Sequence, residues 1–172
     1  MLTTPRLTVT SWTPEDVRDL YDVQSDPETM TFVRHGRPES MAETRDLVDA
    51  YMGQQTEQGW TKWRLADAQG VMIGRAGFGD SPDHRGLSYL IRRSHWRRGL
   101  ATEVAAALVD WHVSQVPGLP LTAIAAVENL ASIRVLQKVG FEDEAHRVDY
   151  EGVMCRSFRH PRPQRPSPKS PS

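Results

Sequence analysis

The sequence predicts a single α/β domain, and three observations support this. A strand-length apolar segment is followed by a helical pattern twice, first after residues 87–92 and again after residues 121–127. Residues 60–79 have the alternation and turn composition of a β-hairpin. The 172 residues, of which 38% are hydrophobic and 25% charged, fit one globular domain with a sizeable core. We expect this domain to span residues 1–160.

The first third of the chain is predicted to contain one strand and two helices. Residues 6–10 alternate polar and apolar side chains and favour a strand. A capped helix follows and is expected to end at residues 25–27, which read Ser-Asp-Pro. Ser40 and Glu43 have the spacing of a capping box, which opens a second helix. A polar loop bracketed by glycines is expected over residues 53–59.

The predicted hairpin consists of strands at residues 60–66 and 71–79, joined by a turn at residues 67–70. The second strand contains three glycines, which add no side-chain packing. Within a strand, glycine often marks a bulge or the close approach of another backbone or a ligand. A simple hairpin with weak packing is the alternative interpretation, and the pattern alone does not choose between them.

The second half of the chain repeats a strand, a turn and a helix. Leu100 begins a stretch of apolar residues at helical spacing, and Asn129 is the expected N-cap of the next helix. Residues 141–150 and 153–159 are predicted to complete the domain as two strands. The proline-rich residues 161–172 are predicted to be a disordered tail.

Composition excludes several classes of partner. The formal net charge is -1 and the isoelectric point is about 6.6, so the chain has no basic footprint for nucleic acid. Cys155 is the only cysteine, so no disulfide can form within the chain. No apolar run approaches the roughly 20 residues that a membrane span needs, and no leader pattern is visible. We expect a cytoplasmic monomer or homodimer that binds neither nucleic acid nor a membrane.

The most informative segment is the turn at residues 96–101, where a helix begins without a Ser, Thr, Asp or Asn cap. Its first amides therefore need another partner. Arg97 and Arg98 add positive charge, while Gly99 and Ala101 are small enough for a phosphate to approach the backbone. These features predict a site for a pyrophosphate. An ordinary surface turn with two solvated arginines is the alternative.

Two common phosphate-binding patterns are absent from the sequence. A P-loop requires G-x-x-x-x-G-K-[ST], and a dinucleotide-binding turn requires G-x-G-x-x-G. The remaining pattern resembles the signature of the GNAT superfamily of N-acetyltransferases, Gln/Arg-x-x-Gly-x-Gly/Ala. Gly99 and Ala101 match this signature, and Trp96 replaces its first residue. An aromatic residue there, followed by Thr102-Glu103, is similar to the ribosomal-protein-alanine acetyltransferase branch.

The resemblance covers nearly the whole chain. Pro5-Arg6-Leu7 and residues 25–30 resemble the opening of that branch, and residues 86–91 resemble its central strand. Residues 129–141 resemble its helix with Asn-x-x-Ser at the start and Lys-x-Gly-Phe at the end. Only the segment after residue 160 falls outside the pattern.

The resemblance implies a GNAT-type α/β fold, with a mixed, mainly antiparallel twisted sheet flanked by about four helices. Two parallel strands, at residues 87–92 and 121–127, would splay apart, and the pantetheine arm of acetyl-CoA would fill the gap between them. Backbone groups of Leu90 and Ile91 would pair with this arm, and Asn129 and Ser132 would approach the arm and the thioester. The pyrophosphate would be held by Trp96, Arg97, Arg98, Gly99, Leu100 and Ala101.

The resemblance also implies direct transfer, in which a neutral amine attacks the thioester and the leaving thiolate is protonated. Ser132 is the candidate acid, although a first-turn serine can instead satisfy a backbone group. Tyr150 is a remote alternative, and Cys155 is interpreted as a core or sheet residue. A water-mediated route needs no base; the residues that could act as one are Asp80, Asp83, His84 and Glu142.

The sequence leaves the amine acceptor open. A protein N-terminus, an amino acid, a polyamine and a drug are all compatible, and no metal ion is expected. A non-catalytic acyl-CoA-binding module is the alternative from another functional class. A nucleotide-binding protein is a third possible function.

Overall fold

In a computed structural model that describes residues 2–79, 81, 83–116 and 118–161, eight strands form one sheet in the order β1-β2-β3-β4-β5-β6-β8-β7. The strands are β1 (Leu2–Thr3), β2 (Leu7–Thr10), β3 (Lys62–Asp67), β4 (Met72–Gly79), β5 (Arg85–Ile91), β6 (Leu121–Ala126), β7 (Glu142–Tyr150) and β8 (Val153–His160). All neighbours are antiparallel except β5 and β6, which are parallel. The predicted mixed, mainly antiparallel sheet is confirmed. Most of the predicted tail, residues 162–172, lies outside the described residues.

Five α-helices accompany the sheet: α1 (Val17–Gln24), α2 (Pro27–Met30), α3 (Met41–Gln58), α4 (Leu100–Gln115) and α5 (Leu130–Lys138). The short α2 was not predicted. The Ser-Asp-Pro segment does end α1, but Asp26 also caps α2, because its carboxylate accepts from the amides of Glu28 and Thr29. The capping box of Ser40 and Glu43 is present at the start of α3.

The loop predicted over residues 53–59 is wrong. α3 continues through Gly53 to Gln58 and ends at Gly59, whose φ of 77° suits a left-handed C-cap. The last turn of this helix is held against the sheet by side chains. Gln54 Oε1 accepts from Thr61 Oγ1 at 3.1 Å, and Gln55 accepts from the indole of Trp63. These contacts offset the modest cost of a glycine within a helix.

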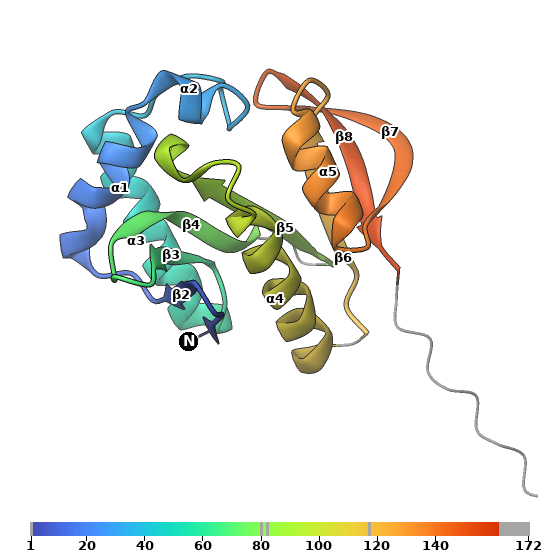
Figure 1. Cartoon of the computed structure of the whole chain (residues 1–172), viewed down its shortest axis with the longest axis horizontal. Coiled ribbons are helices and arrows are strands. Elements are labelled where there is room, and N and C mark those ends of the chain that lie inside the picture. Colours follow the sequence, from blue (N-terminus) through green and yellow to red (C-terminus); the bar gives the residue numbers. More distant parts are fainter. Residues whose placement is uncertain (1, 80, 82, 117, 162–172) are drawn as a thin grey trace, which may run out of the picture.

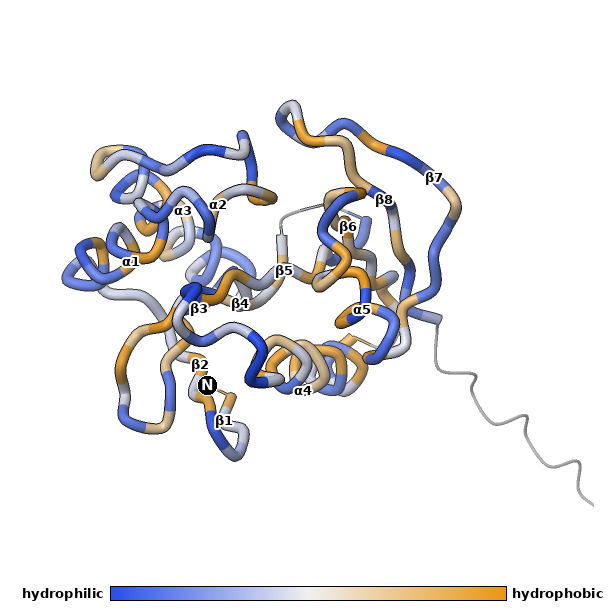
Figure 2. Tube along the Cα trace, turned by 45° about the horizontal axis from the view of Figure 1, so that its top comes forward, coloured by the Kyte–Doolittle hydropathy of each residue, from blue (hydrophilic) through white to orange (hydrophobic). Residues whose placement is uncertain are grey.

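Helices cover both faces of the sheet, and each face has its own core (Figure 1). The larger core packs α4 and α5 against β4 residues such as Ile73 and Phe78. The second core packs α1 and α3 against Met72 and Leu90. Figure 2 shows hydrophobic segments through the central strands, while the edge strand β7 is largely hydrophilic. No helix within the described segments is long and apolar enough to cross a membrane.

The glycines of β4 mark close backbone approaches and a bulge. Leu65 pairs with Gly74 but Ala66 pairs with Met72, so Ile73 is an extra residue on β4. A Cβ on Gly74 would lie 1.9 Å from the carbonyl oxygen of Leu90. The glycines therefore mark a bulge and close backbone approaches, which is the first of the two interpretations of this strand. Neighbouring backbones occupy the space that a side chain would need.

The two parallel strands pair over only part of their length. The register joins Arg85 to Leu121 and runs to Leu87 with Ala123, where it ends. β5 continues to Ile91 paired with β4 on its other edge, while β6 continues along β8. A gap therefore opens between the ends of β5 and β6 that lead to α4 and α5, at the position where the two strands were expected to splay.

Candidate functional site

The turn before α4 presents unpaired backbone amides. Gly99 is the N-cap of α4 and makes no side-chain cap bond, as expected from the sequence. Arg97 and Gly99 have φ angles of 58° and 75°, and such turns form concave nests of amides that bind anions. No amide of residues 97–102 donates to an acceptor within the described part of the chain. The positive end of the helix dipole points to the same place.

Arg6, in the link between β1 and β2, holds this turn in place by hydrogen bonds. Its Nη1 donates to the carbonyl oxygen of Arg98 at 2.7 Å, and its Nε donates to Glu103 Oε2 at 2.6 Å. Burial acts to raise the pKa of Glu103, but bonds from Thr4 and Arg6 outweigh it, so the pKa lies below its usual value. No local sequence pattern indicates this contact, because the partners are 97 positions apart along the chain.

Trp96 connects the turn to the end of β5. Its indole Nε1 donates to the carbonyl oxygen of Ile91 at 2.7 Å, and the side chain remains 44% exposed. The carbonyl of Leu90 is directed at Gly74 on β4, so it faces away from the gap. Because backbone groups alternate along a strand, Tyr89 and Ile91 carry the groups on the gap side. Of Leu90 and Ile91, only Ile91 therefore has its backbone groups on the gap side of β5.

The start of α5 lies across the gap from β5. Asn129 is its N-cap and accepts from the amide of Ser132 at 3.0 Å. The hydroxyl of Ser132 lies 2.8 Å from the hydroxyl of Tyr89. Burial raises the pKa of Tyr89 to about 12, and the bond to Ser132 opposes this only in part. Tyr89 therefore keeps its proton at neutral pH and can donate to Ser132.

The structure thus brings three predicted groups to the edges of one gap. The turn at residues 96–101 and Ile91 lie at the open end, and Asn129 and Ser132 lie at the start of α5. This arrangement can bind a diphosphate at its open end and an extended chain between the strands. The hydroxyl pair of Tyr89 and Ser132 can supply a proton beside that chain. Tyr89 was not predicted, because its contact with α5 exists only in three dimensions.

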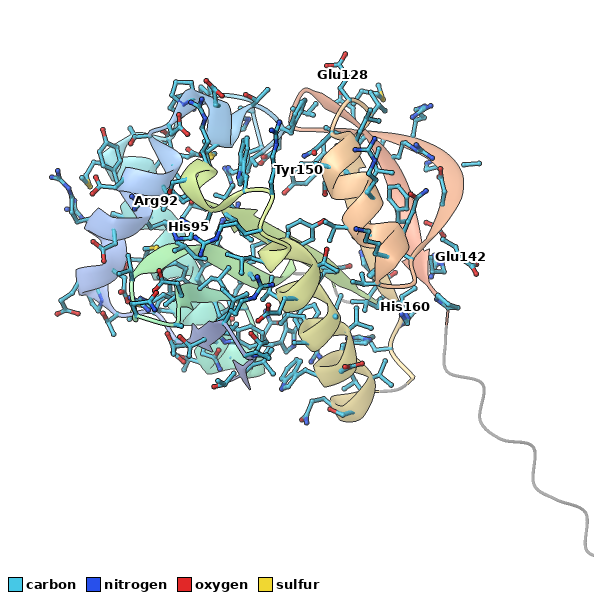
Figure 3. The ribbon with its side chains drawn as sticks, in the orientation of Figure 1. Arg92, His95, Glu128, Glu142, Tyr150 and His160 are labelled. Carbon is cyan, nitrogen blue, oxygen red and sulfur yellow. The ribbon has the colours of Figure 1, made fainter. Side chains whose placement is uncertain are left out.

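The candidate base residues that the structure describes do not gather at this gap. Asp80 lies outside the described residues. His84 Nδ1 contacts Asp83 Oδ1 at 2.8 Å, but both precede β5, about 20 Å from Ile91 by the rise of a strand. Glu142 begins β7 at the outer edge of the sheet (Figure 3).

The other two residues weighed for the chemistry occupy different positions. Cys155 is buried in β8, and burial raises the pKa of its thiol, which disfavours the reactive thiolate. Tyr150 ends β7 and is 40% exposed, in the space between the two halves of the molecule (Figure 3). Burial raises its pKa, and Glu151 adds to this effect.

Comparison with known proteins gives one consistent family. The family model described as acetyltransferase (GNAT) domain matches residues 6–142. An uncharacterized N-acetyltransferase, p20 of Bacillus licheniformis, is 26% identical over 154 residues, which cover 87% of this chain and 86% of the relative.

Solved structures agree on the fold. A GNAT-family acetyltransferase of Bordetella pertussis, described as putative, is 21% identical with a TM-score of 0.79, over 93% of this chain and 98% of its own. RimL, a ribosomal L7/L12 alpha-N-protein acetyltransferase solved in complex with coenzyme A, is 16% identical with a TM-score of 0.78, over 91% and 94% of the two chains. At these identities the likeness establishes the fold alone.

Proposed function

Because the chain belongs to the GNAT acetyltransferase family and is an acetyl-CoA-dependent N-acetyltransferase, we propose that it transfers the acetyl group directly to a primary amine. The acceptor is either a protein N-terminus or a small-molecule amine. The observation that carries this proposal is the row of unpaired amides at residues 97–102, placed at the open end of the gap between β5 and β6.

The proposed binding mode follows from the positions of the turn, of the free edge of β5 and of the start of α5. The pyrophosphate of acetyl-CoA accepts from the amides of the turn, with Arg97 and Arg98 beside it. Small residues at positions 99 and 101 allow the phosphates to approach the backbone. The pantetheine arm then runs between the strands and pairs with backbone groups of Tyr89 and Ile91. Asn129 and Ser132 meet the arm at the start of α5.

The proposed reaction needs no acyl-enzyme. The neutral amine attacks the thioester carbonyl, the C–S bond breaks, and the sulfur leaves as a thiolate that must be protonated. Ser132 donates this proton, Tyr89 gives its own proton to Ser132 through their shared hydrogen bond, and the proton that the amine releases to water returns to Tyr89. The amine loses its own proton to water in this scheme, because the described base candidates lie away from the gap.

The turn assignment is tested by changing Gly99. Gly99→Glu adds a carboxylate to the turn, with its Cβ 3.6 Å from Arg6 Nη2, and places a side chain at a left-handed position; we expect calorimetry to detect no acetyl-CoA binding. Gly99→Gln has nearly the same shape and the same backbone strain, so it isolates the effect of charge and should bind more tightly than Gly99→Glu. Gly118→Glu is the control, because a side chain there meets no atom within 4 Å. Wild-type affinity in folded Gly99→Glu would refute the pyrophosphate assignment.

A further inference from the structure

Three basic side chains gather on the face of the sheet that α1 and α3 cover, apart from the residues assigned to acetyl-CoA. They are Arg34, Lys62 and Arg75, from the segment after α2, from β3 and from β4, and we call them the basic cluster. The charges of Arg75 and Arg34 both act on Lys62. Lys62 Nζ lies 6.0 Å from the centre of the Tyr51 ring.

Acidic residues neutralise only one member of the basic cluster. Arg34 Nε lies 2.8 Å from Glu39 Oε1, and Arg34 Nη2 lies 3.7 Å from Glu151 Oε1. Neither Lys62 nor Arg75 has a carboxylate within 4.0 Å among residues 2–79, 81, 83–116 and 118–161. Three cations therefore face two carboxylates, so the cluster carries at most one net positive charge when Lys62 is protonated.

Arg75 is the least compensated of these side chains. It is only 3% exposed, and its one hydrogen bond is from Nη1 to the neutral hydroxyl of Ser88 at 3.3 Å. Its Nε is buried and has no partner in the described part of the chain. A guanidinium that is buried without a counter-charge is unfavourable, because it has lost its hydration and gained no anion in return. Arg75 is therefore a candidate group for binding an anion.

The position of Arg75 relates this site to the gap. Ser88, which Arg75 contacts, is the first residue of β5 beyond the last pair with β6, Leu87 with Ala123. Arg75 pairs in register with Leu90 and so shares the face of α1 and α3, whereas Tyr89 is on the face of α4. Arg75 therefore lies beside the point where β5 and β6 separate, on the face of the sheet opposite to Tyr89.

We propose that the acceptor is a small amine that carries a carboxylate, as an α-amino acid does, and that Arg75 binds this carboxylate. The inference rests on the proposed acetyl transfer and names the substrate class of that same site. A guanidinium can bind a carboxylate through two parallel hydrogen bonds. In an α-amino acid one carbon separates the carboxylate from the amine, so this contact holds the nitrogen close to Ser88 and the gap. A polyamine fits this site less well, because it would bring further positive charge to the basic cluster.

The protonation of Lys62 supports the assignment of a carboxylate to Arg75. Burial lowers the pKa of Lys62 to about 7, and the charges of Arg75 and Arg34 contribute to this effect. A bound carboxylate would offset these like charges and favour the protonated amine. Lys62 can then act as a second cation for the same carboxylate.

The test compares matched acceptors and matched variants. Each standard α-amino acid is assayed beside its carboxamide and its decarboxylated amine, with spermidine as the polycation. We expect the best acid to exceed its carboxamide in kcat/KM by about 10- to 100-fold, which is the usual range for a hydrogen-bonded charge pair. Arg75→Gln should bring this ratio close to one. Arg64→Gln removes the same charge at the register partner of Arg75 and should keep the ratio.

Calorimetry on the CoA-loaded protein provides a readout that does not depend on turnover. Binding of the acid but not of the carboxamide, lost in Arg75→Gln, would support the carboxylate site even if no amine were acetylated, and would then refute only the proposed transfer. Equal turnover of acid and carboxamide, or preference for spermidine, would refute the carboxylate site and leave acetyl transfer intact. If Arg75→Gln does not fold, the comparison of acid with carboxamide on the wild-type protein decides.

Discussion

The hydroxyl groups of Tyr89 and Ser132 lie 2.8 Å apart, so one contact joins β5 to α5 beside the point where β5 and β6 separate. A proton can pass along this pair from Tyr89 to Ser132 when solvent water returns a proton to Tyr89. Because the pKa of Tyr89 is raised to about 12, its phenol remains protonated through the neutral and mildly alkaline range. Loss of activity through its ionisation is expected only as the pH approaches 12.

Ser132→Ala is predicted to lower kcat about 100-fold and to leave the KM for acetyl-CoA nearly unchanged, because general acid assistance acts on the leaving thiolate rather than on binding. Tyr89→Phe should lower kcat in the same direction. If the two hydroxyls act as one relay, the double variant should be little worse than Ser132→Ala alone. Steady-state kinetics with the best amine measure all three. A near wild-type kcat for Ser132→Ala across the working pH range would make Ser132 a helix-turn residue only.

Arg6→Met is predicted to weaken acetyl-CoA binding by about two- to fivefold, although Arg6 is not proposed to touch the cofactor. The change removes the donor to the carbonyl of Arg98 and leaves Glu103, a carboxylate, without its arginine beside the anion site. Calorimetry measures the affinity. The control is Arg18→Met, which breaks an exposed ion pair with Asp22 and should bind as the wild type does. Equal affinities of the two variants would show that the contacts of Arg6 with Arg98 and Glu103 have no effect on acetyl-CoA binding.

His112 is predicted to make the free energy of unfolding depend on pH. It is 2% exposed, and burial lowers its pKa from 6.5, although the hydrogen bond to the carbonyl of Leu119 opposes this. A histidine that is neutral when folded binds its proton more readily when unfolded. The contribution of His112 to the free energy of unfolding is therefore complete above pH 6.5. It is lost as the pH falls below that value, by at most about 1.4 kcal/mol per pH unit.

Urea unfolding at several pH values measures this dependence. The slope below pH 6.5 should flatten in His112→Gln and persist in His35→Gln, because His35 is exposed. An unchanged slope in His112→Gln would assign the pH dependence to other groups.

Local sequence signals predicted most elements of the fold, since they are made by residues close together in the chain. The capping box of Ser40 and the cap at Asn129 are examples, and both are present. The predictions are wrong where one sequence signal is compatible with two local structures. Asp26 with Pro27 ends one helix and also begins another, and Gly53 was interpreted as a break although packing of the following turn keeps it helical.

The candidate site was predictable only in part for the same reason. The amides of the turn before α4 follow from a missing cap, which is visible in the sequence. The contacts of Arg6 with Glu103 and of Tyr89 with Ser132 join residues 97 and 43 positions apart, and no local pattern encodes them. Arg75 has one local signal in the sequence, because it is a charged residue within an otherwise glycine-rich and apolar strand.

Amine-dependent release of the CoA thiol is the most direct test of the central claim. Purified wild-type protein is mixed with acetyl-CoA and each amine, and both the thiol and the N-acetyl product are quantified. The account predicts that thiol and acetylated amine appear in equal amounts, and that Gly99→Glu releases no thiol above the amine-free rate. Tight acetyl-CoA binding with no amine-dependent thiol release, across amino acids, peptides, polyamines and drugs, would contradict it and indicate a non-catalytic acyl-CoA-binding module.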